Sequence, residues 1–165
     1  EPRRDKRNRR LYILQRGRSG DFAERYTGNI ETQITDAVAR ISGKTKAEKF
    51  IAYFQSYTNT YAPRPYLEKL FCTAVEDKRI AALSIGTRPD CLPPDIIGLL
   101  DELNKIKPVF VELGLQTSNE ATGKLIRRGY PLCVYDEAVY KLKGIGVNVV
   151  THMIIGLAAR KRPRI

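Results

Sequence analysis

The sequence predicts an α/β fold with parallel strands, arranged as an open sheet or as part of a (β/α) barrel. Short apolar runs of strand length alternate with segments whose apolar residues repeat at helical spacing. The centres of four such runs lie about 30 to 40 residues apart, and a helical segment separates each pair. This spacing leaves room for the helical crossover connection that joins two neighbouring parallel strands. Because four strands cannot close a barrel, a barrel formed by this chain is incomplete.

The individual elements are predicted from local signals. Asn29 is a favourable N-cap and Gly43 a favourable stop, so a helix is expected over 30–42. The apolar run 50–54 is expected to be the first buried strand. Thr-Ser-Asn-Glu at 117–120 has the pattern of a capping box at the start of a short helix. Further helices are predicted at 67–75, 96–103, 120–128 and 136–143, and further strands at 80–85, 109–115 and 147–155.

The carboxyl ends of the predicted strands are unusually polar. In parallel α/β folds this edge of the sheet carries the chemistry. Glu112 and His152 even lie within otherwise apolar strands. Either residue alone is as well explained by a satisfied polar group in the core, but four polar strand ends together indicate the rim of a site. These ends are Gln55 to Tyr61, Ser84 to Asp90, Glu112 to Thr117 and His152 to Gly156.

Composition excludes several classes of protein. The 165 residues, 42% of them hydrophobic, suffice for one domain with a buried core. Three cysteines without a CxxC pair exclude a disulfide framework and a zinc ribbon, and a single histidine excludes a His-rich metal site. No apolar run approaches the roughly 18 residues of a membrane span. We therefore expect a cytoplasmic protein with reduced thiols and no membrane partner.

The positive charge is concentrated at the two ends of the chain. The net charge is +11. Residues 1–18 contain eight basic and two acidic residues, a net of +6, and residues 157–165 contain four basic and no acidic residues. The middle, 19–156, therefore carries a net charge of only +1. Such a balanced middle is typical of a globular domain rather than of a nucleic-acid-binding surface.

Four stretches of the middle region resemble a known family. In order they are FIAYFQSYTNTYAP, LSIGTRPDCLP, VELGLQTSNEATGKLIRRG and THMIIGL. In this order and spacing they resemble one branch of the radical S-adenosylmethionine (SAM) proteins, related to elongator-type and coproporphyrinogen-oxidase-type enzymes. The segment from Ser19 to Ala23 also resembles the one that follows the iron–sulfur loop in that branch. The resemblance covers residues 19–156 and implies a radical SAM barrel, here incomplete.

The resemblance implies an enzyme with two cofactors. Members of the family bind a 4Fe–4S cluster through three cysteines, and the amino and carboxylate groups of SAM bind its unique iron. One electron then cleaves SAM to methionine and a 5′-deoxyadenosyl radical, which abstracts a substrate hydrogen. The implied partners are SAM, an electron donor such as flavodoxin or ferredoxin, and a substrate that is RNA or a small molecule.

The cluster motif of the branch resembles C-P-N-R-D-G-T-x-G-x-G-G-C-x-F-C, but this chain has no cysteine before Ser19. One permitted back-translation of residues 1–15, read one nucleotide later, gives N-R-D-G-T-N-G-T-G-G-C-I-F-C. That is the motif without its first cysteine and proline. The shift also explains the basicity, since glycine codons read out of frame become arginine codons. We therefore interpret residues 1–18 as an out-of-frame basic tail.

The same interpretation applies to the other end. A one-base shift after Gly156-Leu157 can restore the Pro-Pro-Glu that the family carries there, so 157–165 is interpreted as a second out-of-frame tail. The partial barrel then spans 19–156. We expect both tails to pack poorly and the chain as written to bind no cluster and to lack activity. The remaining cysteines match no cluster spacing and are not expected to replace the ligands. They are Cys72, Cys91 and Cys133.

By resemblance, Glu112 and Gln116 are the leading SAM-binding candidates, because a carboxylate and an amide can hold ribose hydroxyls or the amino group. Arg88 is expected either to pair with a carboxylate of SAM or substrate, or to form a surface ion pair. Arg128, in the Arg-Arg-Gly-Tyr turn, is a candidate to reach the same site. His152 either lines the barrel floor or reaches the substrate, or it packs in the core. No catalytic residue and no metal ligand is assigned. The cofactor-binding candidates are Ser56, Thr58, Asn59, Ser84, Thr87, Arg88, Glu112, Gln116, Arg128 and His152.

Two other functions compete with a radical SAM enzyme as interpretations of the sequence. A basic nucleic-acid-binding module with Arg-rich arms accounts for the net charge, but not for an alternative frame that spells a cysteine loop. A nucleotide-binding open sheet would be expected to carry a glycine-rich phosphate loop, and the sequence has neither of the two common forms. The sequence therefore favours the radical SAM interpretation.

Overall fold

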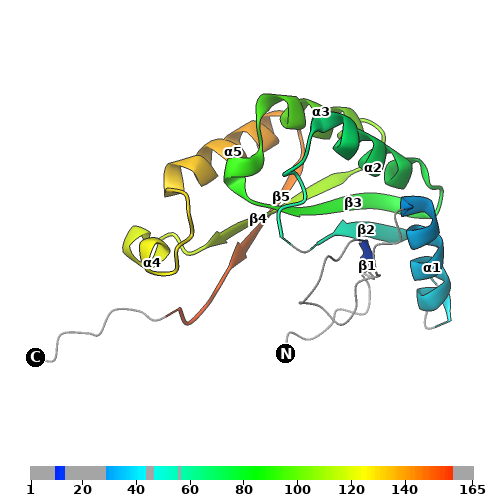
Figure 1. Ribbon diagram of the computed structural model, residues 1–165, viewed down its shortest axis with the longest axis horizontal. Coiled ribbons are helices and arrows are strands. Elements are labelled where there is room, and N and C mark those ends of the chain that lie inside the picture. The colour runs from blue at the N-terminus through cyan, green and yellow to red at the C-terminus, as the bar shows by residue number, and fades with distance from the viewer. Residues whose placement is uncertain (1–9, 14–28, 44–46, 56, 158–165) are drawn as a thin grey trace, which may run out of the picture.

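The sheet at the centre of the molecule has five parallel strands in the sequential order β1-β2-β3-β4-β5 (Figure 1). The computed structural model describes residues 10–13, 29–43, 47–55 and 57–157. The strands are β1 Arg10–Ile13, β2 Phe50–Phe54, β3 Ile80–Thr87, β4 Val109–Gln116 and β5 Asn148–Met153. The helices are α1 Ile30–Ser42, α2 Arg64–Glu76, α3 Pro94–Asn104, α4 Glu120–Leu125 and α5 Leu132–Gly144, with a 3-10 turn η1 Pro89–Cys91. This series of parallel strands confirms the predicted fold class, an incomplete (β/α) barrel.

One face of the sheet carries the hydrophobic core. The strand residues of that face pack with apolar residues of α1, α2, α3 and α5 in a single cluster. Phe54 and Phe71 meet edge to face there, with ring centroids 4.9 Å apart, and both are fully buried. In Figure 1 the helices α2, α3 and α5 lie together on one side of the strands. Burial of this apolar layer fixes the strand register, because a slip of one residue would turn it outward.

The opposite face of the sheet is polar. Successive strand residues alternate between the faces. In β3, Leu83 and Ile85 face the core, so Ser84 and Gly86 face the other way. The pairing places Gly86 beside Glu112 of β4. It also places Gly114 beside His152 of β5. The register therefore collects the polar residues of neighbouring strands on the face away from the core.

The predicted helix at 30–42 is confirmed, and its N-cap is the expected one. The Asn29 side chain accepts hydrogen bonds from the amides of Glu31 and Thr32 at 2.8 and 3.3 Å. The strands predicted from residue 50 onward are present, with ends that differ by at most two residues. The helix α5 begins at Leu132, four residues before its predicted start at 136. Pro131 precedes it, and proline favours helix initiation.

The predicted capping box at 117–120 is wrong. The N-cap of α4 is Asn119, whose side chain accepts from the Thr122 amide at 2.9 Å, while Thr117 Oγ1 accepts from the Asn119 amide at 3.2 Å. The helix also ends at Leu125, not near Arg128. The chain turns there because Arg127 adopts a positive φ of 55° and the Arg128 amide bonds back to the Gly123 carbonyl.

The strand β1 was not predicted. It falls in the segment interpreted as an out-of-frame tail and pairs in parallel with β2, from Arg10 opposite Ile51 to Ile13 opposite Phe54. The other residues of the two tails, 1–9, 14–18 and 158–165, lie outside the described residues. For Arg10–Ile13 the expectation of a poorly packed tail is therefore wrong. Because strand pairing uses backbone groups that nearly every sequence supplies, it does not decide the reading frame. No helix in the described part of the chain is long and apolar enough to cross a membrane.

Candidate functional site

Glu112 lies at the centre of a hydrogen-bonded cluster that joins four strands. Its carboxylate belongs to β4, and its side chain is 1% exposed. Ser84 of β3 donates to Oε1 at 2.5 Å, and Tyr53 of β2 donates to Oε2 at 2.8 Å. His152 Nε2 of β5 lies 2.6 Å from the same Oε2. A buried carboxylate needs such donors, because losing water without them costs several kcal/mol.

Three members of the cluster, Tyr53, Glu112 and His152, line a cavity of about 620 Å³. Space of this size holds a ligand of cofactor dimensions. The cavity opens at the carboxyl ends of β2 to β5, where a parallel α/β sheet presents its chemistry. Its wall includes seven of the ten predicted site residues: Thr58, Thr87, Arg88, Glu112, Gln116, Arg128 and His152. The prediction that Thr87 and Glu112 share one rim is therefore confirmed.

Gln116 is held in an unusual backbone conformation at the mouth of this cavity. Its φ is +65°, and the Thr117 amide bonds to the Leu115 carbonyl at 2.7 Å across it. This is a γ-turn of the rarer, strained hand. Its own carbonyl accepts from the Ile154 amide at 2.9 Å, which ties the turn to the end of β5. Strain of this kind at a strand end is typical of binding sites.

Two glycines keep the wall open. Gly86 and Gly114 both line the cavity, next to Glu112 and His152 in the neighbouring strands. A Cβ at Gly114 would lie 2.8 Å from Gln116 Nε2, and one at Gly86 would lie 3.3 Å from the Phe54 carbonyl oxygen. A side chain at Gly114 would therefore displace the Gln116 amide. Gly114 thus leaves room for the Gln116 amide, and Gly86 allows the close approach of the Phe54 carbonyl.

The arginines of the site divide into structural and available groups. Arg128 is structural: its side chain is 2% exposed and donates to the carbonyls of Tyr130 and Thr117 and to Glu120 at 2.6 to 2.9 Å. The neighbouring Arg127 is exposed and also lines the cavity. The described residues record no ion pair for Arg127. The arginine predicted from the sequence was Arg128, and the exposed Arg127 was not among the predicted site residues.

Arg88 is also engaged within the protein. It forms a bidentate pair with Asp90, at 2.9 and 2.7 Å, which lowers the pKa of that carboxyl. Its guanidinium also lies over the Tyr130 ring, 5.6 Å from the centroid. Tyr130 donates to the Gly114 carbonyl, and burial raises the pKa of its hydroxyl. Of the two alternatives for Arg88, the ion pair is present.

Two further candidates hold the rim together. Asn59 donates from Nδ2 to the carbonyls of Phe54 and Gly86, at 3.1 and 2.8 Å, and so clamps the loop after β2 onto β3. Thr87 Oγ1 lies 2.5 Å from Thr60 Oγ1. These contacts use the polar atoms of Asn59 and Thr87 for structure. Ser56 lies outside the described residues. Tyr53, inside an apolar run, was not among the candidates.

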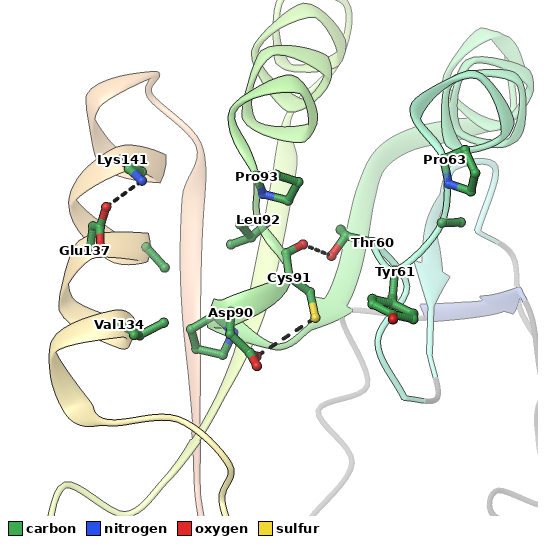
Figure 2. A pocket seen from close by; sticks show the side chains of 13 residues that line it. Thr60, Tyr61, Pro63, Asp90, Cys91, Leu92, Pro93, Val134, Glu137 and Lys141 are labelled. Carbon is green, nitrogen blue, oxygen red and sulfur yellow. Dashed lines mark hydrogen bonds and ion pairs between the residues drawn. The ribbon is translucent and has the colours of Figure 1, made fainter.

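A second cavity, of about 650 Å³, lies between η1, the loop before α2, and α5 (Figure 2). Figure 2 shows Lys141 paired with Glu137, at 2.6 Å, on the α5 side. Thr60 donates to the Cys91 carbonyl at 2.5 Å on the other side. The rest of the wall is mostly proline and aliphatic side chains. None of the ten sequence-predicted site residues is among the described residues that line this cavity.

The three cysteines lie on three different elements of the fold. Cys72 lies on α2, Cys91 in η1 at the second cavity, and Cys133 is exposed on α5. Burial raises the pKa of the Cys72 and Cys91 thiols, which disfavours the thiolate that a cluster ligand requires. Among the described residues no three His, Cys, Asp or Glu side chains are placed to hold a metal ion. This part of the chain therefore does not fit an iron–sulfur cluster.

Comparison with known proteins identifies the relatives of the chain. The profile of the Radical SAM superfamily matches residues 18–159. The uncharacterised protein YtqA of Bacillus subtilis is 44% identical over 144 residues, which are 87% of this chain and 45% of YtqA. Protein YhcC of Escherichia coli is 37% identical over 113 residues, 68% of this chain and 37% of YhcC. The chain thus spans less than half the length of these relatives.

A solved structure supports the fold. The Elp3 protein of the archaeon Methanocaldococcus infernus, with an N-terminal deletion, superposes with a TM-score of 0.64 over 76% of this chain and 34% of its own. The two sequences are 22% identical, so this likeness concerns the fold alone. It agrees with the incomplete (β/α) barrel described above.

Proposed function

Since this chain belongs to the radical SAM superfamily, we propose that the cavity beside Glu112 is a SAM-binding site. The observation that carries the proposal is the cluster around Glu112, in which Tyr53, Glu112 and His152 line this cavity and Ser84 holds the carboxylate from β3. A protein does not bury a carboxylate on the open face of a sheet for packing, because apolar residues would stabilise that face at lower cost.

The charges of the cavity match those of SAM. SAM carries a positive sulfonium, an amino group and a carboxylate. The Glu112 cluster places a carboxylate on one wall, which favours the sulfonium and the amino group. Arg127, exposed on the cavity wall, is the guanidinium suited to the SAM carboxylate. The Gln116 amide and the Thr58 hydroxyl can bond ribose or amino groups from the same rim.

The family also implies a 4Fe–4S cluster, which supplies the electron that cleaves SAM reductively. We propose that residues 1–18 are an out-of-frame reading of the loop that would hold it, and 157–165 a second such reading. The chain as written then binds SAM weakly and generates no 5′-deoxyadenosyl radical. The nucleotide sequence upstream of the Ser19 codon tests this directly. A cysteine loop in the alternative frame supports the proposal, and synonymous codons that spell no such loop contradict it.

We further propose the setting in which the frame-restored enzyme works. It is a cytoplasmic enzyme that takes its electron from a flavodoxin or ferredoxin, and its substrate is RNA or a small molecule. The hydrogen to be abstracted lies on that substrate, and the cavity wall orients SAM toward it. The single membrane-related observation, the lack of a spanning helix in the described residues, agrees with this setting.

Titration calorimetry of the 165-residue chain with SAM tests the binding site. We expect binding, and we expect Arg127→Ala to weaken it by roughly 10- to 100-fold, the loss of a charged hydrogen-bonded contact. Lys124→Ala is the matched control, because Lys124 is exposed on nearby α4 and does not line the cavity. No heat of binding from the unmodified chain, or equal losses from the two variants, would contradict the proposal.

A further inference from the structure

We infer that His152, rather than the carboxylate of Glu112, is the hydrogen-bond acceptor that this wall offers to SAM. Glu112 is then a positioning residue that holds the imidazole ring. The inference rests on the proposed function, which places SAM in this cavity, and it divides the work between two residues of one cluster. Two observations carry it: the occupancy of both Glu112 oxygens and the half-exposed ring of His152.

The Glu112 carboxylate faces into the protein and is already satisfied. Its side chain is 1% exposed. Ser84 occupies Oε1 at 2.5 Å, and Tyr53 and His152 occupy Oε2 at 2.8 and 2.6 Å. A carboxylate that receives three donors from within the protein has little capacity left for a ligand. Of the roughly four acceptor positions of a carboxylate, these three contacts already take most.

The His152 ring, in contrast, is half exposed. Its side chain is 50% exposed, and the residue lines the cavity. Its neighbour across the β4–β5 pairing is Gly114, which has no side chain to cover the ring. One ring nitrogen thus contacts a buried carboxylate, while the half-exposed residue lines the cavity.

The contact with Glu112 also fixes which nitrogen carries the proton. With the Glu112 carboxylate ionised, and therefore only accepting hydrogen bonds, we infer that Nε2 donates and carries the hydrogen. In the neutral ring Nδ1 then has a lone pair, and the described residues record no hydrogen bond to it. A neutral imidazole oriented in this way accepts from a hydroxyl or amino group. SAM has both, in its ribose and in its amino and adenine groups.

Nitrogen-15 NMR of the imidazole shows which ring nitrogen carries the hydrogen. The signals need no assignment, because His152 is the only histidine of the chain. We expect the imidazole signals of the neutral ring to show hydrogen on Nε2, and saturating SAM to shift the Nδ1 resonance while Nε2 keeps its hydrogen. A purely structural histidine would show no SAM-dependent change at Nδ1. A neutral ring with hydrogen on Nδ1 would overturn the inference.

A double-mutant cycle on SAM affinity separates the two residues. We expect His152→Ala to weaken binding roughly 2- to 10-fold, the loss of one neutral hydrogen bond. In that background Glu112→Gln should cost less than about twofold more, because Glu112 acts through the ring. Full additivity of the two losses would overturn the inference and assign the contact to Glu112. Thr151→Ala, which truncates the adjacent β5 residue on the other face, is the control for strand damage.

The outcomes also distinguish a failure of this inference from a failure of the proposed SAM binding. Should SAM shift the backbone amides of Gly86 and Gly114 but neither imidazole nitrogen, the cavity binds SAM and the role of His152 is refuted. An unchanged spectrum at saturating SAM refutes both. The amide spectrum of each variant reports whether it folds, and Glu112→Asp replaces Glu112→Gln if the latter does not fold.

Discussion

Replacing Tyr53 by phenylalanine removes one donor from the buried carboxylate and leaves the ring in place. Tyr53 is 4% exposed, and its hydroxyl lies 2.8 Å from Glu112 Oε2. Water cannot readily replace the lost donor at such burial. A hydrogen bond to a charged group contributes about 1.5–3 kcal/mol. Ser84 and His152 still hold the carboxylate, so we expect a loss of about 2 kcal/mol in the free energy of unfolding.

The same substitution at Tyr135 is a matched control. Its hydroxyl lies 2.5 Å from Thr151 Oγ1, but this contact is neutral and exposed, so Tyr135→Phe should cost less than about 0.5 kcal/mol. Urea unfolding followed by circular dichroism measures both variants, and the slope with urea should be unchanged. For a chain of this length the Tyr53→Phe loss corresponds to a fall of about 4–8 °C in Tm. Equal costs for the two variants would refute the claim that the open face holds a buried, charged cluster.

Two further predictions concern the pH dependence of the Asp77–Arg79 ion pair and the packing of the cavity wall. Asp77 accepts from Arg79, which lowers its pKa below the ordinary 3.8. A lowered pKa stabilises the fold above the unfolded-state value and loses that effect as the pH falls through the folded-state value. Asp77→Asn should therefore cost about 1 kcal/mol at pH 7 in urea unfolding, with the difference shrinking below about pH 4; a constant difference would contradict this. Gly114→Ala should displace the flexible Gln116 amide, since its Cβ would lie 2.8 Å from Nε2. Calorimetry should then show weaker SAM binding with an unfolding free energy changed by less than about 1 kcal/mol, whereas unchanged affinity would exclude Gln116 from the site.

Much of the fold could be predicted because its signals are local. Asn29 and Gly43 bracket α1 at the predicted positions, and the apolar run 50–54 is β2. The polar strand ends indicated the rim of a site because parallel strands bring their carboxyl ends to one edge. Glu112 and Gln116 stood out for the same reason, since each is polar within or at the end of an apolar run.

The features that were missed depend on contacts between distant residues or on backbone geometry. The Tyr53 hydroxyl finds its acceptor 59 residues away, so within an apolar run it looked like any core aromatic residue. Arg127 and Arg128 are adjacent and identical in type. In the structure Arg128 is buried and paired with Glu120 of α4, whereas Arg127, at a positive φ, is exposed, and both residues line the cavity. No periodicity in the sequence carries that information.

The central claim is that this barrel cleaves SAM once its cysteine loop is restored. The most direct measurement is anaerobic iron–sulfur reconstitution followed by an assay for 5′-deoxyadenosine under a strong reductant. It compares the 165-residue chain with a protein whose frame is restored, including the first cysteine and the remaining strands. We predict cluster absorbance and 5′-deoxyadenosine from the restored protein only. If the restored protein gives neither cluster absorbance nor 5′-deoxyadenosine, the proposed function is contradicted. If the chain as written gives both signals, the frame interpretation is contradicted.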